Sequence, residues 1–335
     1  MNFQIVLLMR MKNFLLSSLA IGALLTSCSD GADKKSKVPE LKSMKCEFVA
    51  DGDTAVFFGK NLRDANFYFY GNQKAVIDSV NSNDSIAFVI VPSGASAGKI
   101  CVENQNGISY SKFMFRDYRN TIVDFDSKLA TWGGFAPFDE HGEKITQTYD
   151  GENVTKIPAA LPDKCDGTYG FLYGNYENAW SMTQTMFLQY VANPAEGGRG
   201  NFSIAGEFRG YPIEELALKF EVYIPKECPY NNLRTEIFFG PFNSPDKHGR
   251  DKSPIYFWEP YKTNGDFYTD GWQTITVPLT EFWHTTTSDE AKFENPINLK
   301  DATNFTFVQF GNASKENPVP IFICVDNFRV VPIAE

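Results

Sequence analysis

The feature that most constrains the fold is a series of short runs rich in β-branched and aromatic residues, each closed by a turn of Gly, Pro, Asn or Asp. Runs of about four to eight such residues are typical of β-strands, and no stretch has a convincing helical period. The composition agrees, because 30 Phe, 15 Tyr, 25 Gly and 18 Pro favour many short strands over long helices. The sequence therefore predicts an all-β protein.

The charge of the chain limits its partners. The formal net charge is −10 with 31 Lys and Arg. Nucleic acid is excluded as a partner by this argument, because its binding needs clustered cations that displace counterions. Acidic polysaccharides are disfavoured for the same reason, whereas neutral ligands are unaffected.

One stretch, Pro254–Tyr261 followed by Gly271–Trp283, carries more aromatic surface than two strands need. The proline between Trp258 and Tyr261 cannot continue a central ladder, so we expect these rings where a strand leaves its sheet. Rigid rings beside a carboxylate such as Glu259 suit a ligand with alternating C–H faces and hydroxyls. The simplest such ligand is a sugar. The alternative is that each ring belongs to the core.

The N-terminal segment has the pattern of an export signal. Residues 11–28 contain a basic start, an apolar run too short for a membrane span, and a cysteine after small residues. Leu25-Thr26-Ser27-Cys28 resembles the lipobox of bacterial lipoproteins. The resemblance implies a lipoprotein signal peptide over residues 1–28 and a lipid on Cys28. The alternative is an ordinary secretory signal with an incidental cysteine.

A polar segment follows the lipobox. Residues 29–42 have no periodicity, which is typical of a flexible tether. Asp30 and Asp33 resemble the signal that sends some lipoproteins to the outer face of the outer membrane. We therefore expect a cell-surface protein that meets the membrane only through its lipid anchor.

The remaining cysteines carry no metal or redox motif. They are Cys46, Cys101, Cys165, Cys228 and Cys324. An odd number leaves at least one unpaired even in an oxidising compartment, and no C-x-x-C spacing is present. We expect buried free thiols.

Residues 43–117 have the strand spacing of a small sandwich. The order Phe58–Leu62, Val91–Gly98, Val102–Gly107 resembles the immunoglobulin-like IPT/TIG domain, which implies a spacer. Gly94–Gly98 also matches the G-x-S-x-G nucleophile motif of hydrolases. That motif needs a strand-to-helix turn, whereas here the turn precedes another strand, so Ser96 is not expected to be a nucleophile.

Residues 118–335 predict a larger β-sandwich of jelly-roll type. The pattern Gly271-Trp-Gln, Val277-Pro-Leu and Val325–Val330 resembles jelly-roll carbohydrate-binding modules. The whole order of lipobox, tether, IPT/TIG domain and aromatic sandwich resembles the type B surface glycan-binding proteins of polysaccharide-utilisation loci, whose C-terminal domain was described for xyloglucan.

This resemblance implies a protein that holds a neutral polysaccharide on an aromatic platform without cutting it. Xyloglucan, mannan and other β-glycans all present faces on which rings can stack. The implied partners are an outer-membrane glycan importer and neighbouring lipoproteins. The candidate platform residues are Trp180, Trp258 and Tyr261, then Trp132, Tyr176 and Trp283, with Glu259 as a polar neighbour.

Two other functions stay open at this point. A β-sandwich glycoside hydrolase or lyase needs two carboxylates across the scissile bond, but the adjacent acidic pairs would point to opposite faces of a strand. The three histidines are isolated and are expected in turns. The third possibility is an adhesin that binds protein.

No cofactor is required by either of the binding functions. Asp124, Asp126 and Asp326 are expected near each other if the first and last strands of the larger sandwich meet. Related sandwiches hold a structural Ca²⁺ through such oxygen ligands. The alternative is that these are ordinary carboxylates at strand ends.

Overall fold

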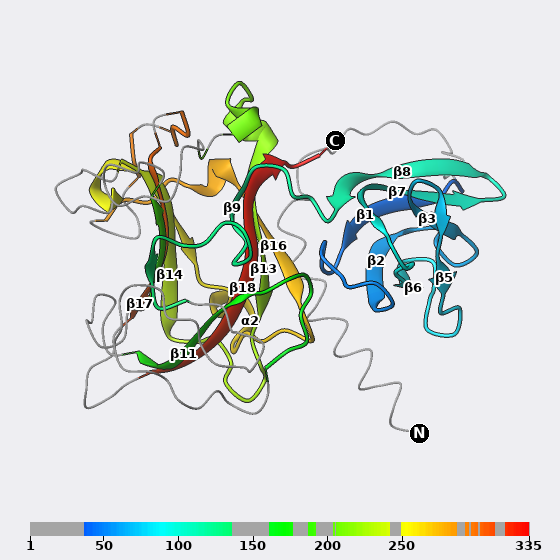
Figure 1. Cartoon of the computed structure of the whole chain (residues 1–335), viewed down its shortest axis with the longest axis horizontal. Helices are drawn as coiled ribbons and strands as arrows, with labels where there is room; N and C mark the ends of the chain where they lie inside the picture. Colours follow the sequence, from blue (N-terminus) through cyan, green and yellow to red (C-terminus); the bar gives the residue numbers. More distant parts are fainter. Residues whose placement is uncertain are drawn as a thin grey trace, which may run out of the picture.

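The computed structural model describes residues 37–135, 161–176, 187–191, 204, 206–241, 249–286, 292–294, 296–300, 302–311 and 319–334. These residues form two β-sandwiches that lie side by side (Figure 1). All strand pairs are antiparallel. The predicted all-β fold, with a small immunoglobulin-like sandwich before a larger jelly-roll-like one, is confirmed.

The small sandwich consists of two four-stranded sheets in the orders β1-β2-β6-β5 and β4-β3-β7-β8. Its strands are β1 (Glu40–Met44), β2 (Thr54–Lys60), β3 (Asn66–Tyr70), β4 (Gln73–Lys74), β5 (Val76–Ile77), β6 (Ile86–Ile90), β7 (Ser96–Asn104) and β8 (Gly107–Phe115). Every second residue of β6 is buried, as expected for a strand with one face on the core. Ser96 opens β7, so the G-x-S-x-G segment leads into a strand and lacks the geometry of a nucleophile elbow.

The large sandwich packs a sheet of order β10-β12-β17-β14-β15 against one of order β11-β18-β13-β16, with β9 also pairing with β18. Its strands are β9 (Thr121–Val123), β10 (Trp132–Gly133), β11 (Gly170–Tyr176), β12 (Phe187–Val191), β13 (Leu216–Tyr223), β14 (Leu233–Gly240), β15 (Ile255–Trp258), β16 (Gln273–Pro278), β17 (Asn304–Gly311) and β18 (Val319–Pro332). Short helical turns join some of them: η2 (Gly206–Phe208), η3 (Ile213–Glu215), η4 (Arg250–Lys252), α2 (Tyr261–Asn264) and η5 (Leu279–Glu281).

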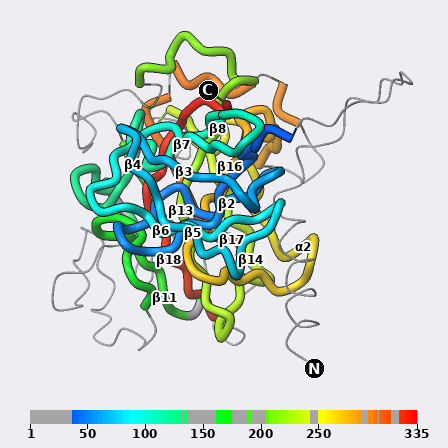
Figure 2. Tube along the Cα trace, turned by 90° about the vertical axis from the view of Figure 1, so that its right-hand side faces the viewer, coloured from blue at the N-terminus to red at the C-terminus, as the bar shows by residue number. Residues whose placement is uncertain are grey.

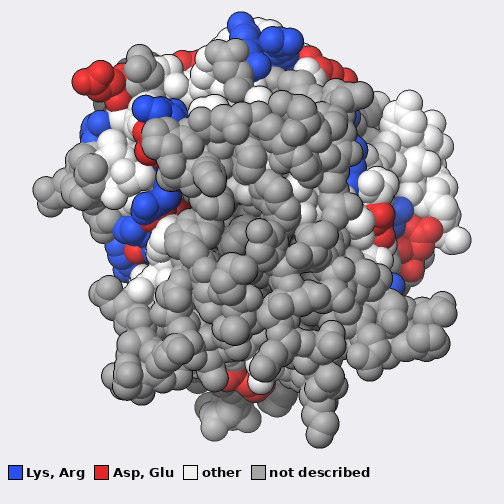
Figure 3. All heavy atoms as spheres, turned by 60° about the vertical axis from the view of Figure 1, so that its left-hand side comes forward, with Lys and Arg blue, Asp and Glu red and all other residues white. Residues whose placement is uncertain are grey.

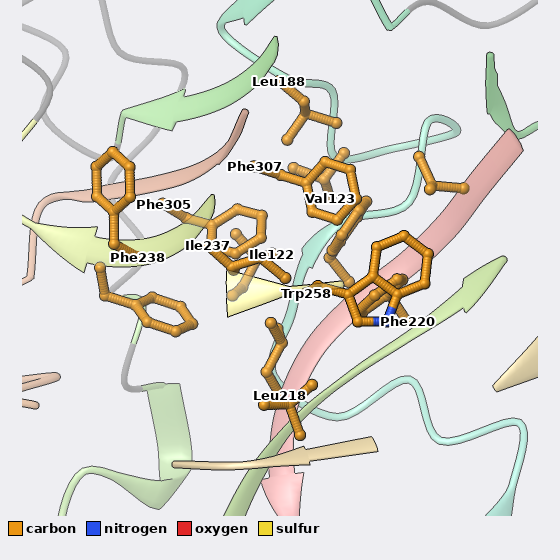
Figure 4. Packing of buried hydrophobic residues seen from close by; sticks show 14 of the residues in the cluster. Ile122, Val123, Leu188, Leu218, Phe220, Ile237, Phe238, Trp258, Phe305 and Phe307 are labelled. Carbon is orange, nitrogen blue, oxygen red and sulfur yellow. The ribbon is translucent and has the colours of Figure 1, made fainter. Parts of the chain in front are cut away.

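Aromatic rings fill the core between these two sheets. Phe220 of β13, Phe307 of β17 and Phe328 of β18 pack with ring centres 5.2–5.6 Å apart. Figure 4 shows the rings of Phe220, Phe305 and Phe307 converging between the strands. Burial of such large apolar surfaces is the main source of stability for the sandwich.

A buried charge cluster joins the two sandwiches. The backbone N–H of Thr274 in β16 donates to the carbonyl of Lys45, just after β1. Beside this contact, the carboxylate of Glu47 accepts hydrogen bonds from Lys219 at 2.6 Å and from Arg329 at 2.8 Å. Arg329 also donates to Glu221 at 2.8 Å. All four side chains are buried, and the two acids balance the two bases. We call Glu47, Lys219, Glu221 and Arg329 the interface charge cluster.

Viewed from the end, the small sandwich lies in front of β13, β16 and β18 of the large one (Figure 2). Trp272, which precedes β16, is half-buried and donates through Nε1 to the carbonyl of Asp163 at 2.7 Å. This contact ties the start of β16 to the segment before β11.

The five cysteines of the described residues are free thiols, as predicted. Cys46, Cys165 and Cys324 are buried, while Cys101 and Cys228 are half-buried. Among the described residues, no helix is long and apolar enough to cross a membrane.

Candidate functional site

Four half-buried side chains at one edge of the β14–β15 sheet form a stacked column, in the order Trp283, His284, Phe257, Arg234. The His284 ring centre lies 3.6 Å from that of Trp283 and 4.0 Å from that of Phe257. The guanidinium carbon of Arg234 lies 3.9 Å from the centre of the Phe257 ring. A bridge between Ile255 and His284 aligns the segment after η5 with β15 and so builds the column.

A buried carboxylate fixes the cationic end of the column. Glu236 of β14 is fully buried, and its oxygens accept hydrogen bonds from Arg234 at 2.7 Å and from Arg250 at 2.6 Å. Arg250 also lies over the ring of Phe310, 4.6 Å from its centre. Two guanidinium groups and one carboxylate leave one net positive charge here. Such pairing holds both arginines in a fixed orientation.

Tyr261 and Glu259 adjoin this end, where β15 gives way to α2. The Tyr261 hydroxyl donates to Glu259 at 3.4 Å, and Lys262 forms an ion pair with the same carboxylate at 2.6 Å. Burial is the main cause that raises the pKa of Tyr261; Glu259 raises it further, while Lys262 and Arg234 oppose the change. The structure therefore brings three of the predicted site residues, Tyr261, Glu259 and Trp283, to the two ends of one column.

This arrangement combines flat rings with fixed hydrogen-bonding groups. His284 and Arg234 cover the two faces of Phe257, so a sugar would meet the edges of the stacked rings and the outer side of Trp283. Guanidinium and carboxylate groups can bind its hydroxyls. The exposed Lys292 lies at the other end, 5.4 Å from the centre of a Trp283 ring. On the side of the molecule that carries β14 and β17, Lys and Arg gather along one margin with Asp and Glu beside them (Figure 3).

Two predicted platform residues are core residues instead. Trp258 is 4% exposed and Tyr176 is 3% exposed. Trp258 packs on Phe220 and Phe307 between the two sheets (Figure 4). The prediction that these two rings stack on ligand is wrong, because strand alternation turns Trp258 inward and Phe257 outward. The proline after Trp258 ends the strand without exposing the ring.

The side chains of two other predicted residues are not among those that the structure describes. The backbone of Trp132 forms part of β10, at the opposite edge of the same sheet from β15, but its side chain is not described. Trp180 lies outside the described residues.

The aspartates proposed for calcium make contacts within the chain. Asp124 accepts hydrogen bonds from the backbone of Asp126, Ser127 and Lys128 and so closes a turn. Asp326 is buried, and burial is the main cause that raises its pKa well above the ordinary value. No group of three or more acidic, histidine or cysteine side chains in the described residues is arranged to hold a metal. The calcium site at Asp124, Asp126 and Asp326 stays a prediction.

The site also contains residues that the sequence did not single out. His284 was expected in a turn, but it is the centre of the stacked column. Phe257, Arg234 and Glu236 come from two paired strands, with Glu236 opposite Phe257 in the register. The alternation of side chains along a strand predicts that Phe257 and Trp258 lie on opposite faces. It does not predict which of the two faces the core.

Comparison with protein families decides the relationship. A model described as the surface glycan-binding protein B xyloglucan-binding domain matches residues 115–332. The chain belongs to this family. Its match spans the large sandwich from the end of β8 to the end of β18, including the whole stacked column.

Solved surface glycan-binding proteins of type B share the fold. One from Prevotella bryantii is 18% identical with a TM-score of 0.60, covering 88% of this chain and 76% of that one. Another, from a complex xyloglucan utilisation locus in Bacteroides uniformis, is 20% identical with a TM-score of 0.57, covering 88% and 73%. A structure solved with a xylogluco-oligosaccharide is 18% identical with a TM-score of 0.56, covering 88% and 58%. A comparison with curated protein sequences gave no match.

Proposed function

We propose that this surface glycan-binding protein captures a neutral β-glycan on the stacked column and does not cut it. The observation that carries the proposal is the column itself, in which Trp283, His284 and Phe257 lie beside the paired Arg234 and Glu236. A xyloglucan-like chain is the first candidate ligand, since the matching family domain is described by that glycan. Mannan and other neutral β-glycans are the next candidates.

Further contacts along the glycan come from the remaining predicted residues. Tyr261 and Glu259 extend the site at the cationic end of the column. Trp132 and Trp180 are proposed as additional stacking residues. Each stacked ring contributes about 0.5–1.5 kcal/mol beyond area burial, if aromatic pairs are a guide. Three rings with a few hydrogen bonds then give a dissociation constant of roughly micromolar to millimolar order.

A non-catalytic role fits the chemistry of the site. Both oxygens of Glu236, the buried carboxylate beside the column, accept hydrogen bonds from arginines. That carboxylate positions the guanidinium groups and has no free oxygen facing a glycosidic bond. A hydrolase or lyase remains the alternative function, and it predicts products from the bound glycan.

The proposed location follows from the N-terminal pattern. A lipid on Cys28 would anchor the protein at the outer surface of the outer membrane, and the small sandwich would act as a spacer. Bound glycan would pass to an importer and neighbouring lipoproteins. Weak sites suffice there, because many anchored copies bind one long chain together.

Native gel retardation tests the proposal. The soluble chain from residue 29 is run through gels containing xyloglucan, mannan, mixed-linkage glucan or an acidic polysaccharide, and reducing ends are assayed in parallel. We expect retardation by a neutral β-glycan, no new reducing ends, and about tenfold or greater loss of affinity in Phe257→Ala and Trp283→Ala. A loss of about 1.4 kcal/mol corresponds to that factor.

The matched control is Tyr268→Ala, which removes an exposed ring from the same sandwich. Equal loss in this control would mean that the column is not the site. Retardation by no glycan would contradict the capture function and favour the adhesin. Released reducing ends would favour the enzyme.

A further inference from the structure

Two cysteines from different sandwiches meet in one buried cluster. Cys46 follows β1 of the small sandwich, and Cys165 lies in the segment that precedes β11 of the large one. Both are 5% exposed and pack with Phe48 in a cluster separate from the two main cores. Val49 and Trp272 cover its side.

The neighbours of this pair hold each thiol in place. Cys46 donates to the carbonyl of Phe48 at 2.9 Å, and the sulfur of Cys165 lies 3.9 Å from Asp326. The two side chains belong to the same three-residue cluster with Phe48, and burial is the main cause that raises the pKa of Cys165. The backbone around Cys165 is fixed to the large sandwich, because Trp272 donates to the Asp163 carbonyl.

One member of the pair, Cys165, also lines an opening between the sandwiches. A cavity of about 460 Å³ at the junction of the sandwiches is lined by Cys165 and its neighbours Lys164 and Asp166, and from the small sandwich by Asp51 and Arg116. A disulfide reagent that enters this cavity therefore lies next to Cys165.

Because Cys46 and Cys165, free thiols in the structure, belong to one buried cluster between the sandwiches, we propose that they are the partners of a disulfide that joins the two sandwiches covalently. Formation is thiol–disulfide exchange with an oxidised partner of the disulfide class, either a protein disulfide or oxidised glutathione. The Cys165 thiolate attacks the partner's disulfide, releasing one partner thiol, and Cys46 then displaces the second. The two protein S–H bonds are lost, one S–S bond forms, and the partner is reduced to two thiols.

The other cysteines of the described residues are placed differently. Cys101 lies in β7 of the small sandwich, and Cys228 and Cys324 contact a separate cluster on the large one. Cys46 and Cys165 are free thiols in the structure. The proposed disulfide is the oxidised form of the same interface. The proposed cell-surface location supplies the oxidising surroundings that it needs.

Non-reducing peptide mapping tests the proposal. The full-length chain is incubated, folded, with oxidised glutathione, denatured, alkylated with iodoacetamide, digested and analysed by mass spectrometry. We expect one cross-linked peptide pair containing Cys46 and Cys165, with Cys101, Cys228 and Cys324 alkylated. Dithiothreitol should abolish the cross-link. Recovery of both Cys46 and Cys165 as alkylated thiols, or their linkage to other cysteines, would overturn the proposal.

Matched variants separate the bond from general stability. Cys46→Ser should leave Cys165 alkylated, whereas Cys228→Ser should leave the cross-link intact. The midpoint of thermal unfolding should be higher for the oxidised wild type than for the reduced one, and equal in the two conditions for Cys46→Ser. Glycan retardation is measured on the same samples. Absence of the cross-link then contradicts only the disulfide, and absence of retardation contradicts only the capture function.

Discussion

Phe257 and Trp258 are consecutive in β15 and have opposite surroundings. Phe257 is half-buried between His284 and Arg234, whereas Trp258 is 4% exposed among the rings of the core. Both are large and aromatic, so composition does not distinguish them. Their roles follow from the direction in which the strand turns each side chain.

Replacement of Trp258 should therefore affect stability rather than recognition. Trp258→Ala leaves a cavity beside Phe220 and Phe307 and is expected to lower the free energy of unfolding by about 3–5 kcal/mol. Urea unfolding followed by circular dichroism measures the change. The fraction that stays folded should keep the glycan affinity of the wild type. Loss of glycan affinity without loss of stability would mean that Trp258 contacts the glycan after all.

At the level of single elements, strand existence was predictable and strand environment was not. The alternating runs at Ile86–Ile90 and Gln273–Pro278 are strands in the structure. The column could not be predicted, because it joins β14, β15 and the segment after η5, which meet only through pairing of strands distant in sequence. The charged partners Arg234 and Glu236 looked like ordinary residues of an alternating strand.

Strand β11 gives a prediction at this level. Gly170, its first residue, lies against the ring of Phe125, and an added Cβ would overlap that ring. Phe125 is 2% exposed and has little room to move. Gly170→Ala should lower the free energy of unfolding by about 1–3 kcal/mol. The matched control is Gly210→Ala, where an added Cβ meets nothing within 4 Å.

Urea denaturation of both variants checks this expectation. A near-neutral effect for Gly210→Ala together with clear destabilisation for Gly170→Ala is expected. Equal urea midpoints for the two variants would mean that Phe125 moves away from β11 at little cost in free energy.

For the whole molecule, the interface charge cluster makes stability depend on pH. Burial raises the pKa of Glu221 to about 7 from 4.5, although Arg329 opposes the shift. Between about pH 4.5 and pH 7, Glu221 keeps its proton in the folded chain but has lost it in the unfolded chain. The contribution of this carboxyl is thus fully present below about pH 4.5 and is lost as the pH rises through about 7. A shift of this size corresponds to about 3 kcal/mol.

Glu221→Gln should remove this dependence. We expect the wild type to lose more of its free energy of unfolding than the variant between pH 5 and pH 8, measured by urea denaturation at each pH. Glu214→Gln, at an exposed position, is the control and should follow the wild type. Identical pH profiles for wild type and Glu221→Gln would contradict the raised pKa.

The position of β18 also sets the order in which the molecule can assemble. This last strand lies between β11 and β13, pairs with β9, and carries the Arg329 that meets Glu47 across 282 positions of sequence. A chain made from its N-terminus can complete the small sandwich early, but Glu47 gains its second buried partner, Arg329, only when the final residues arrive. Arrival of β18 completes the large sandwich and the interface charge cluster in the same event. A chain interrupted before Val319 would thus carry a complete small sandwich beside a large one that lacks its central strand β18.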